Sequence, residues 1–215
     1  MTSFNIGVKV GFMALANSDK RTANSGISAF ILAGGRSSRM GSDKALLRID
    51  KRTLLERALH TVSTITPTSY IVGSKQRYGS FGETMEDIYP GCGPLGGIHA
   101  ALTATTTGLN LILSVDMPLM TPEFLRWLVE KARASEEWIV LPEVAGGPQP
   151  LCATYRRAVA AVAEEVLQTG DYKIARLFER VPTRMVAETE ILGAGFSPEI
   201  FRNVNTPEEY AQCRP

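Results

Sequence analysis

The chain has 215 residues, 44% of them hydrophobic, so it can bury one good core and fits one α/β domain better than two. A formal net charge of +1 gives no overall indication of a nucleic-acid or membrane partner, and no apolar run approaches the ~18 residues that a membrane-spanning helix needs. The cysteines Cys92, Cys152 and Cys213 are far apart and odd in number, which argues against a disulfide framework or a structural zinc site and makes a reducing cytoplasm the expected location.

The first 26 residues contain no functional motif. Alternating apolar residues near the start are typical of a strand, and the segment Ala14–Ala16 imitates a signal-peptidase site. No basic region precedes an apolar stretch, and Lys9 interrupts the apolar residues, so export is not expected. We therefore expect residues 1–26 to form a flexible or edge-strand extension and residues 27–215 to form a single domain. The sequence leaves open whether the chain starts at Met1 or at Met13.

The first confident strand, Ile27–Ala33, stops at the pair Gly34-Gly35. A polar loop follows, and it carries Arg36, Arg39 and Lys44. Paired glycines let the backbone approach a ligand closely, and the basic side chains supply charge to phosphate oxygens. These residues predict a phosphate site and therefore a nucleotide ligand, the alternative being a surface loop with a solvated charge cluster. Neither G-x-x-x-x-G-K-[ST] nor G-x-G-x-x-G fits the glycines, which argues against a P-loop ATPase and a Rossmann dehydrogenase.

The middle of the chain alternates between helix and strand signals. Thr53 and Glu56 form a T-x-x-E capping box before apolar residues at helical spacing, and Tyr70–Val72 is typical of a short strand. Asp87 then leads into a glycine-rich segment whose turns bring the backbone close to a ligand, and a helix is expected over Pro94–Ala104. The alternative for Asp87 is a helix-capping role.

Asp116 follows a second apolar strand, expected over Leu109–Val115. A carboxylate at the end of a buried parallel strand lies at the edge of an α/β sheet where ligands bind. Asp116 is therefore the best candidate for a metal ligand. The alternative is an aspartate that begins a turn before Pro118.

The rest of the chain continues the alternation, starting with a helix capped by Thr121 that has Pro122 at its first position and ends near Ala134. The remaining elements are a strand over Trp138–Leu141, a loop over Pro142–Pro150, a strand over Leu151–Thr154, a helix over Tyr155–Leu167, a short helix within Gly170–Arg180, a strand over Arg184–Val186 and a helix start capped by Thr206 and Glu209. Such alternation predicts a three-layer α/β domain with a mainly parallel sheet. In that fold the loops at Gly34, Asp87 and Asp116 converge at one edge of the sheet.

Taken together, the motifs resemble those of the MobA-like nucleotidyltransferase family. The matching segments are Leu32–Lys44 with L-A-G-G-x-S-x-R-M-G-x-D-K, Asp87–Ile98 with D-x-x-x-x-x-G-P-L-G-G-I, Ser114–Pro118 with S-V-D-M-P, Gln149–Leu151 with Q-P-L, and Asn203–Glu209 with N-x-N-T-P-E-E. The resemblance extends from Ile27 to Cys213. It departs from the family at Ser74, near which family members often carry an asparagine that touches the nucleotide.

The resemblance implies a three-layer α/β/α fold, Rossmann-like and GT-A-like, and transfer of GMP from GTP to the phosphate of molybdopterin with Mg²⁺ as cofactor. It implies the catalytic residues Lys44, Arg39 and Asp116, with Asp116 also the metal ligand. The implied nucleotide-binding residues are Leu32, Ala33, Gly34, Gly35, Lys44, Asp87 and Asp116. The implied acceptor-binding residues are Gln149, Pro150, Asn203 and Asn205.

Two alternatives remain open. The first is a transferase of the same fold that uses CTP or acts on a sugar phosphate. The second is a non-catalytic nucleotide-binding protein, against which Lys44 and Asp116 argue. Gly34 favours GTP, because cytidylyl-transferring relatives more often have alanine there. The expected partners are GTP, molybdopterin and other proteins of molybdenum cofactor biosynthesis, with no nucleic acid and no membrane, and a monomer or weak oligomer is expected.

Overall fold

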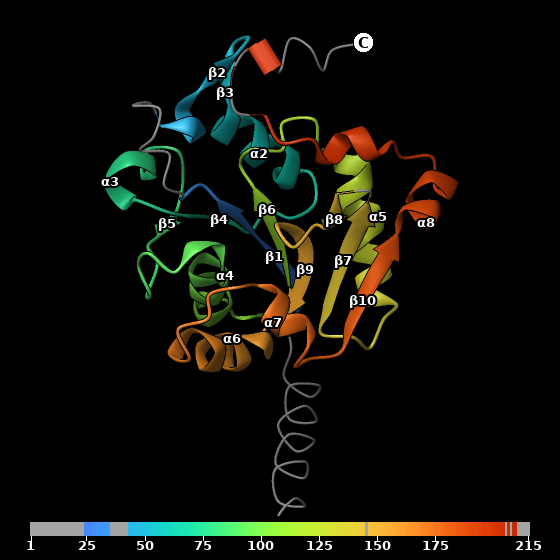
Figure 1. Ribbon diagram of the computed structural model, residues 1–215. Coiled ribbons are helices and arrows are strands. Elements are labelled where there is room, and N and C mark those ends of the chain that lie inside the picture. Colours follow the sequence, from blue (N-terminus) through green and yellow to red (C-terminus); the bar gives the residue numbers. More distant parts are fainter. Residues whose placement is uncertain (1–23, 35–42, 145, 205, 207, 210–215) are drawn as a thin grey trace, which may run out of the picture.

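The computed structural model (Figure 1) describes residues 24–34, 43–144, 146–204, 206 and 208–209. Within these residues an eight-stranded sheet has the order β10-β7-β9-β6-β1-β4-β5, with β8 paired to β7. The strands are β1 (Asn24–Leu32), β4 (Ser69–Val72), β5 (Thr84–Met85), β6 (Thr107–Ser114), β7 (Ile139–Val144), β8 (Gly147–Pro148), β9 (Cys152–Arg156) and β10 (Thr183–Ala187). A separate two-stranded hairpin joins β2 (Arg48–Ile49) to β3 (Arg52–Thr53).

The main sheet is mostly parallel, as the sequence predicts. The strand β1 runs parallel to β4 and β6, β4 is parallel to β5, and β7 is parallel to β10. The exceptions are β8, antiparallel to β7, and β9, antiparallel to β6 and β7. Only residues 145–151 separate β7 from β9, and a parallel crossover needs about a dozen residues or more. The short connection therefore makes β9 antiparallel.

Helices cover both faces of the sheet, which confirms the three-layer prediction (Figure 1). They are α2 (Leu54–Ser63), α3 (Lys75–Tyr78), α4 (Gly93–Ala104), α5 (Pro122–Arg133), α6 (Val159–Gln168), α7 (Ala175–Phe178) and α8 (Glu188–Gly193), with 3₁₀ helices η2 (Lys44–Leu46) and η3 (Pro198–Phe201). None of the helices in the described ranges has the length and apolar character needed to cross a bilayer.

Two hydrophobic cores lie on opposite faces of the sheet, and β1 supplies both. Ile31 packs with residues of α2, α5 and α8, whereas Phe30 packs with residues of α4, α6 and α7. Successive side chains of a strand point to opposite faces, so a fully apolar run fits a strand covered on both sides. A fully buried side chain of this size stabilises the fold by about 1.5–3 kcal/mol. The site loops therefore begin from strands held rigidly between two cores.

The predicted helix starts at Thr53 and Thr121 are confirmed. The Thr53 hydroxyl accepts from the Glu56 backbone N–H at 3.1 Å, and the Glu56 carboxylate accepts in return from the Thr53 N–H at 2.6 Å. Thr121 accepts from the N–H of Phe124 at 3.3 Å. Each cap satisfies a donor that the first helical turn leaves unpaired.

Several predicted boundaries were wrong, and three of these differences bear on the fold. The strand β1 begins at Asn24, three residues before the expected start at Ile27. The strand β7 continues to Val144 through the expected loop, because its end pairs with β8. Tyr155 belongs to β9 and not to a helix, since it pairs with β6 and β7 and is fully buried. The division of the chain at residues 26 and 27 stays a prediction, although that boundary falls inside β1.

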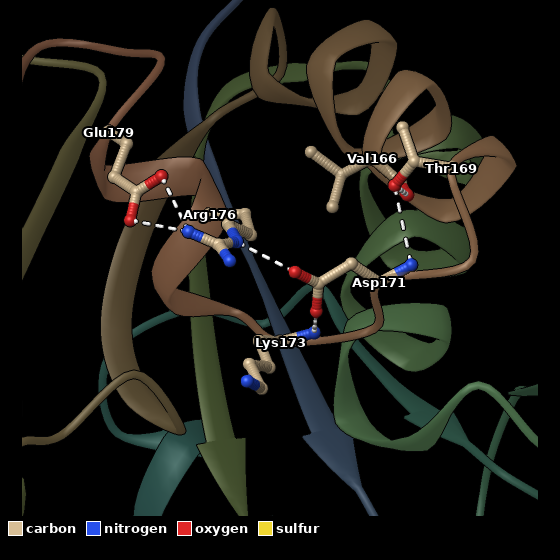
Figure 2. Close-up of polar contacts among 6 residues, drawn as sticks. All are labelled: Val166, Thr169, Asp171, Lys173, Arg176 and Glu179. Atoms are coloured by element: carbon tan, nitrogen blue, oxygen red, sulfur yellow. Dashed lines mark hydrogen bonds and ion pairs between the residues drawn. The ribbon is translucent and has the colours of Figure 1, made fainter.

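The turn between α6 and α7 is held by local polar contacts (Figure 2). Arg176 donates from Nε to Asp171 at 2.7 Å and from Nη1 to Glu179 at 3.0 Å. The Thr169 hydroxyl donates to the carbonyl of Val166 at 2.7 Å and accepts from the Asp171 N–H at 3.3 Å. The charged side chains of these contacts are 33–59% exposed, so the ion pairs define the course of the turn more than they stabilise the fold.

Candidate functional site

The site forms where neighbouring parallel strands end at the same edge of the sheet. Leu32, the last residue of β1, lies opposite Ser114 of β6 and Val72 of β4, and Val72 lies opposite Met85 of β5. The N–H of Val115 continues this pairing by donating to the carbonyl of Leu32 at 3.1 Å. The loops at Gly34, Asp87 and Asp116 therefore leave from one edge, as the sequence predicts.

At this edge Lys44 and Asp116 form an ion pair. The Lys44 Nζ lies 3.0 Å from the Asp116 Oδ2, and the two side chains are 25% and 23% exposed. The hydroxyl of Ser114 donates to the other carboxylate oxygen, Oδ1, at 2.5 Å. Asp116 is thus oriented by its own strand, while both of the paired charges remain accessible to a ligand.

Lys44 is positioned by Asp43 at the start of η2. One oxygen of the Asp43 carboxylate accepts from the N–H of Ala45 at 3.1 Å, which caps the helix. The same carboxylate accepts from the Tyr78 hydroxyl at 2.9 and 3.0 Å and pairs with Arg77 at 3.3 Å.

Sequence reasoning matched Asp43 to the family motif but gave it no role, and it did not single out Tyr78. An aspartate directly before a short helical turn is an N-cap signal, so the capping role of Asp43 could have been predicted from the sequence. No local pattern predicts Tyr78, because the two residues are 35 positions apart in the chain.

Asp87 lies between β5 and the start of α4, where glycines let the backbone approach it. A Cβ at Gly97 would lie 3.6 Å from the Asp87 Oδ1, and a Cβ at Gly96 would lie 2.9 Å from the carbonyl oxygen of Tyr89. Any side chain at Gly96 would therefore push this loop away from the helix. Burial raises the pKa of the Asp87 carboxyl, because a low-dielectric surrounding disfavours its charged form.

The other nucleotide-binding candidates differ in what they can offer a ligand. The side chains of Leu32 and Ala33 are buried in the two cores, so only their backbone can face a nucleotide. Gly34 is exposed. Gly35 and Arg39 lie outside the described residues, and their roles stay predictions.

Two of the acceptor-binding candidates, Gln149 and Pro150, lie in the turn that precedes β9. Gln149 donates from Nε2 to the carbonyl of Gly147 at 3.0 Å, and the Tyr155 hydroxyl donates to the carbonyl of Pro150 at 2.8 Å. The carbonyl of Leu151 accepts from the N–H of Ser114 at 2.7 Å. This turn is therefore fixed beside the strand that carries Asp116.

Asn203 is exposed and precedes Val204, whose N–H donates to the carbonyl of Asp116 at 2.9 Å. A segment near the end of the chain is thus held against the loop that carries the candidate metal ligand. Asn205 falls outside the part of the chain that the structure describes. The acceptor-binding role of these residues stays a prediction.

The donor atoms around Asp116 fit a small, hard cation that brings its own oxygen ligands. In the described ranges no group of three or more His, Cys, Asp or Glu side chains is placed to hold a metal. Mg²⁺ commonly takes one or two protein carboxylates together with phosphate oxygens and waters. A lone carboxylate beside a candidate phosphate site fits that chemistry, whereas a structural zinc site needs four protein ligands, and no such group is found among the described residues.

Comparison with known proteins agrees with this geometry. Residues 29–185 match the MobA-like NTP transferase domain. A protein from Pelotomaculum thermopropionicum, named "Probable molybdenum cofactor guanylyltransferase", is 31% identical over 186 residues, which cover 86% of this chain and 90% of the relative.

Solved structures show the same fold. The crystal structure of the molybdopterin-guanine dinucleotide biosynthesis protein A from Archaeoglobus fulgidus superimposes with a TM-score of 0.74 and 24% identity, covering 86% of this chain and 96% of that one. A Mycobacterium tuberculosis protein in complex with manganese gives a TM-score of 0.60 at 18% identity, with coverage of 89% and 98%. The match over most of the chain, the ion pair at the sheet edge and the shared fold have one explanation: the chain belongs to the MobA-like NTP transferase family and is a nucleotidyltransferase.

Proposed function

We propose that the protein transfers GMP from GTP to the phosphate of molybdopterin, giving the molybdenum cofactor guanine dinucleotide and pyrophosphate. The observation that carries the proposal is the pairing of Lys44 with Asp116 at the sheet edge, at 3.0 Å. The pairing supports the proposal because a cation suited to phosphate and a carboxylate suited to a metal ion lie next to each other. The name of the Pelotomaculum relative supports the choice of guanylyl transfer.

In the proposed reaction an oxygen of the acceptor phosphate attacks the α-phosphorus of GTP in line. A new P–O bond forms, the bond between the α-phosphorus and the bridging oxygen breaks, and its electron pair leaves with pyrophosphate. The attacking oxygen is already anionic, so no general base is needed. The protein contributes positioning and charge stabilisation, for which Lys44, Arg39 and the Gly34-Gly35 backbone are the proposed groups.

Asp116 is the residue proposed to hold Mg²⁺, with the Ser114 hydroxyl fixing the carboxylate's orientation. Mg²⁺, when bound, neutralises charge on the triphosphate and on the departing pyrophosphate. The Asp116 Oδ2 contacts Lys44. A bound triphosphate would offer the Lys44 amine further acceptor oxygens, which would leave the carboxylate available to the metal ion.

The acceptor is proposed to bind at Gln149, Pro150, Asn203 and Asn205. The turn at Pro150 is tied to Tyr155, and the segment at Asn203 is tied to Asp116 through Val204. Both segments thus have a fixed relation to the metal-binding candidate, which is what in-line attack requires.

A panel of GTP, CTP, ATP and UTP, each with Mg²⁺, tests the proposal by thermal shift. A nucleotide present at about 100 times its Kd stabilises the folded state by about 2.7 kcal/mol. We expect the largest shift with GTP, and we expect dinucleotide to form when molybdopterin is added. If CTP stabilises the protein as much as GTP or more, the proposed reaction is cytidylyl transfer instead. If none of the four nucleotides stabilises the protein, the proposal of nucleotidyl transfer is excluded.

A further inference from the structure

Tyr78 connects two segments that border the candidate phosphate loop. It is the last residue of α3 and is 3% exposed. Its hydroxyl lies 3.1 Å from the carbonyl oxygen of Ala33, directly after β1, and 2.9 and 3.0 Å from the carboxylate oxygens of Asp43, directly before η2. One buried hydroxyl thus touches both the residue before Gly34 and the residue before Lys44.

The hydroxyl has a single proton and faces three acceptor oxygens. A charged acceptor gives the stronger and shorter hydrogen bond, so donation to Asp43 is favoured and the Ala33 carbonyl takes the remaining share. Burial, together with the Asp43 carboxylate, raises the pKa of Tyr78, which keeps the proton on the hydroxyl. The contact therefore holds Asp43 close to the end of β1.

Asp43 transmits this contact to Lys44. Its side chain is 15% exposed, caps η2 through the Ala45 N–H and pairs with Arg77. The carbonyl of Asp43 also accepts from the N–H of Leu46 at 3.0 Å. These bonds fix the first turn of η2, and with it the direction in which the Lys44 side chain leaves the backbone.

The ring of Tyr78 is itself held in place. A Cβ at Gly73 would lie 2.8 Å from the ring, so the ring rests directly on the backbone that follows β4. The N–H of Gly73 donates to the carbonyl of Met85 at 2.8 Å, which ties this backbone to β5. Tyr78 therefore links the segment that carries Lys44 to the strands of the sheet.

We propose that Tyr78 is a positioning residue for nucleotide binding, whose hydroxyl holds Asp43 against the end of β1 and so places the Lys44 amine for the triphosphate. The inference rests on the proposed function, since it takes Lys44 as the contact to phosphate. It goes beyond that function by adding a buried residue that acts through another side chain.

The test is a double-mutant cycle on the Kd for GTP with Mg²⁺, measured by titration calorimetry. Tyr78→Phe keeps the ring on Gly73 and removes only the hydroxyl, and Tyr70→Phe on β4 is the matched control. Loss of a hydrogen bond to a charged group costs roughly a factor of ten, so we expect Tyr78→Phe to raise the Kd about tenfold. In the Lys44→Ala background we expect the same substitution to change the Kd by less than about twofold, because the residue through which it acts is gone.

Failure of this inference and failure of the proposed function would give different results. If wild type binds GTP and Tyr78→Phe binds equally well, or weakens binding by the same factor in both backgrounds, the tyrosine is only structural and the inference is overturned. If wild type binds no nucleotide, the proposed function itself has failed. Should Tyr78→Phe not fold, Asp43→Asn tests the same contact, because the amide can still cap Ala45 but accepts a weaker bond from Tyr78. The same rise in Kd, absent from the Lys44→Ala background, is then expected, and an unchanged Kd overturns the inference.

Discussion

The Lys44 amine and the Asp116 carboxylate lie 3.0 Å apart although 72 residues separate them in the chain. Each belongs to a different sequence motif, one after β1 and one after β6. The two strands pair in parallel register up to Leu32 and Ser114, so the pairing of the strands brings the two charges together. The ion pair is accordingly a product of the fold, and its accessibility makes it available to a nucleotide and a metal ion.

Replacing Lys44 by alanine is expected to lower transferase activity by at least ~10²-fold, because it removes a charge that stabilises the transition state. The fold should survive, since the side chain is not part of either hydrophobic core. Steady-state kinetics and the circular dichroism spectrum provide the measurement. Lys51→Ala, an exposed lysine in the β2–β3 turn, is the control and should keep normal activity. Near-normal turnover of Lys44→Ala would place the lysine on the solvated surface.

Gly34→Ala tests the basis of the nucleotide preference. An added Cβ would lie 3.8 Å from the Gly73 Cα and 3.9 Å from the Val72 carbonyl oxygen, which are ordinary contacts, so the variant should fold. Under the proposed function the methyl group would occupy space beside the base, and a change of this size alters discrimination by about tenfold or more. We expect the ratio of the GTP and CTP affinities to fall by that factor. Gly82→Ala is the control, and an unchanged ratio would mean that this glycine does not select the purine.

Asp87→Asn is expected to stabilise the nucleotide-free protein at pH 7. Burial raises the pKa of Asp87, so the folded state binds the proton more tightly than the unfolded state does, and stability falls as the pH rises through the folded-state pKa. Asparagine removes that penalty. The gain should shrink as the pH falls towards and below about 4, the ordinary pKa of aspartate, because the carboxyl then becomes protonated in the unfolded state as well as in the folded state. Urea unfolding at the two pH values measures it.

Asp171→Asn is a control for which the opposite change in stability is expected. Its hydrogen bond with Arg176 lowers the pKa of the Asp171 carboxyl (Figure 2), so Asp171→Asn should destabilise the protein at pH 7, and this loss should fade as the pH falls through the lowered pKa. A destabilising Asp87→Asn at pH 7 would show that the buried carboxylate is stabilised by contacts that outweigh its desolvation.

Removal of residues 1–23 should leave nucleotide binding intact, because β1 and every described site residue lie beyond that point. Removal of residues 1–26 is expected to lower stability. The first pairing of β1 with β6, Asn24 opposite Thr107, is then lost, next to the buried hydrogen bond from Thr107 to Ser28. Melting temperature and GTP titration of the two truncations check this. Loss of binding on removal of 1–23 would show that the segment packs on the core.

Sequence reasoning succeeded where the information is local. Buried strands such as β1 and β6 are continuous apolar runs, the caps at Thr53 and Thr121 are short motifs, and the strand ends carry glycine or aspartate. It failed at Tyr155, because an apolar stretch in which Ala and Val follow at helical spacing does not reveal that its first residues pair with β6 and β7. The contact of Tyr78 with Asp43 joins residues 35 positions apart and depends on the folded arrangement, which no local pattern encodes.

The central claim, that Asp116 holds the metal ion for nucleotidyl transfer, is tested most directly by Asp116→Asn. Asparagine keeps the size and can still accept from Ser114, but it removes the charge that a hard cation requires. The variant should still bind GTP weakly, the difference between its GTP affinities with and without Mg²⁺ should shrink, and dinucleotide formation should fall steeply, whereas Glu123→Gln on α5 should behave as wild type. Turnover of Asp116→Asn at the normal rate with the normal Mg²⁺ optimum would contradict the account and would make Asp87 or Asn205 the next candidates for the metal ligand.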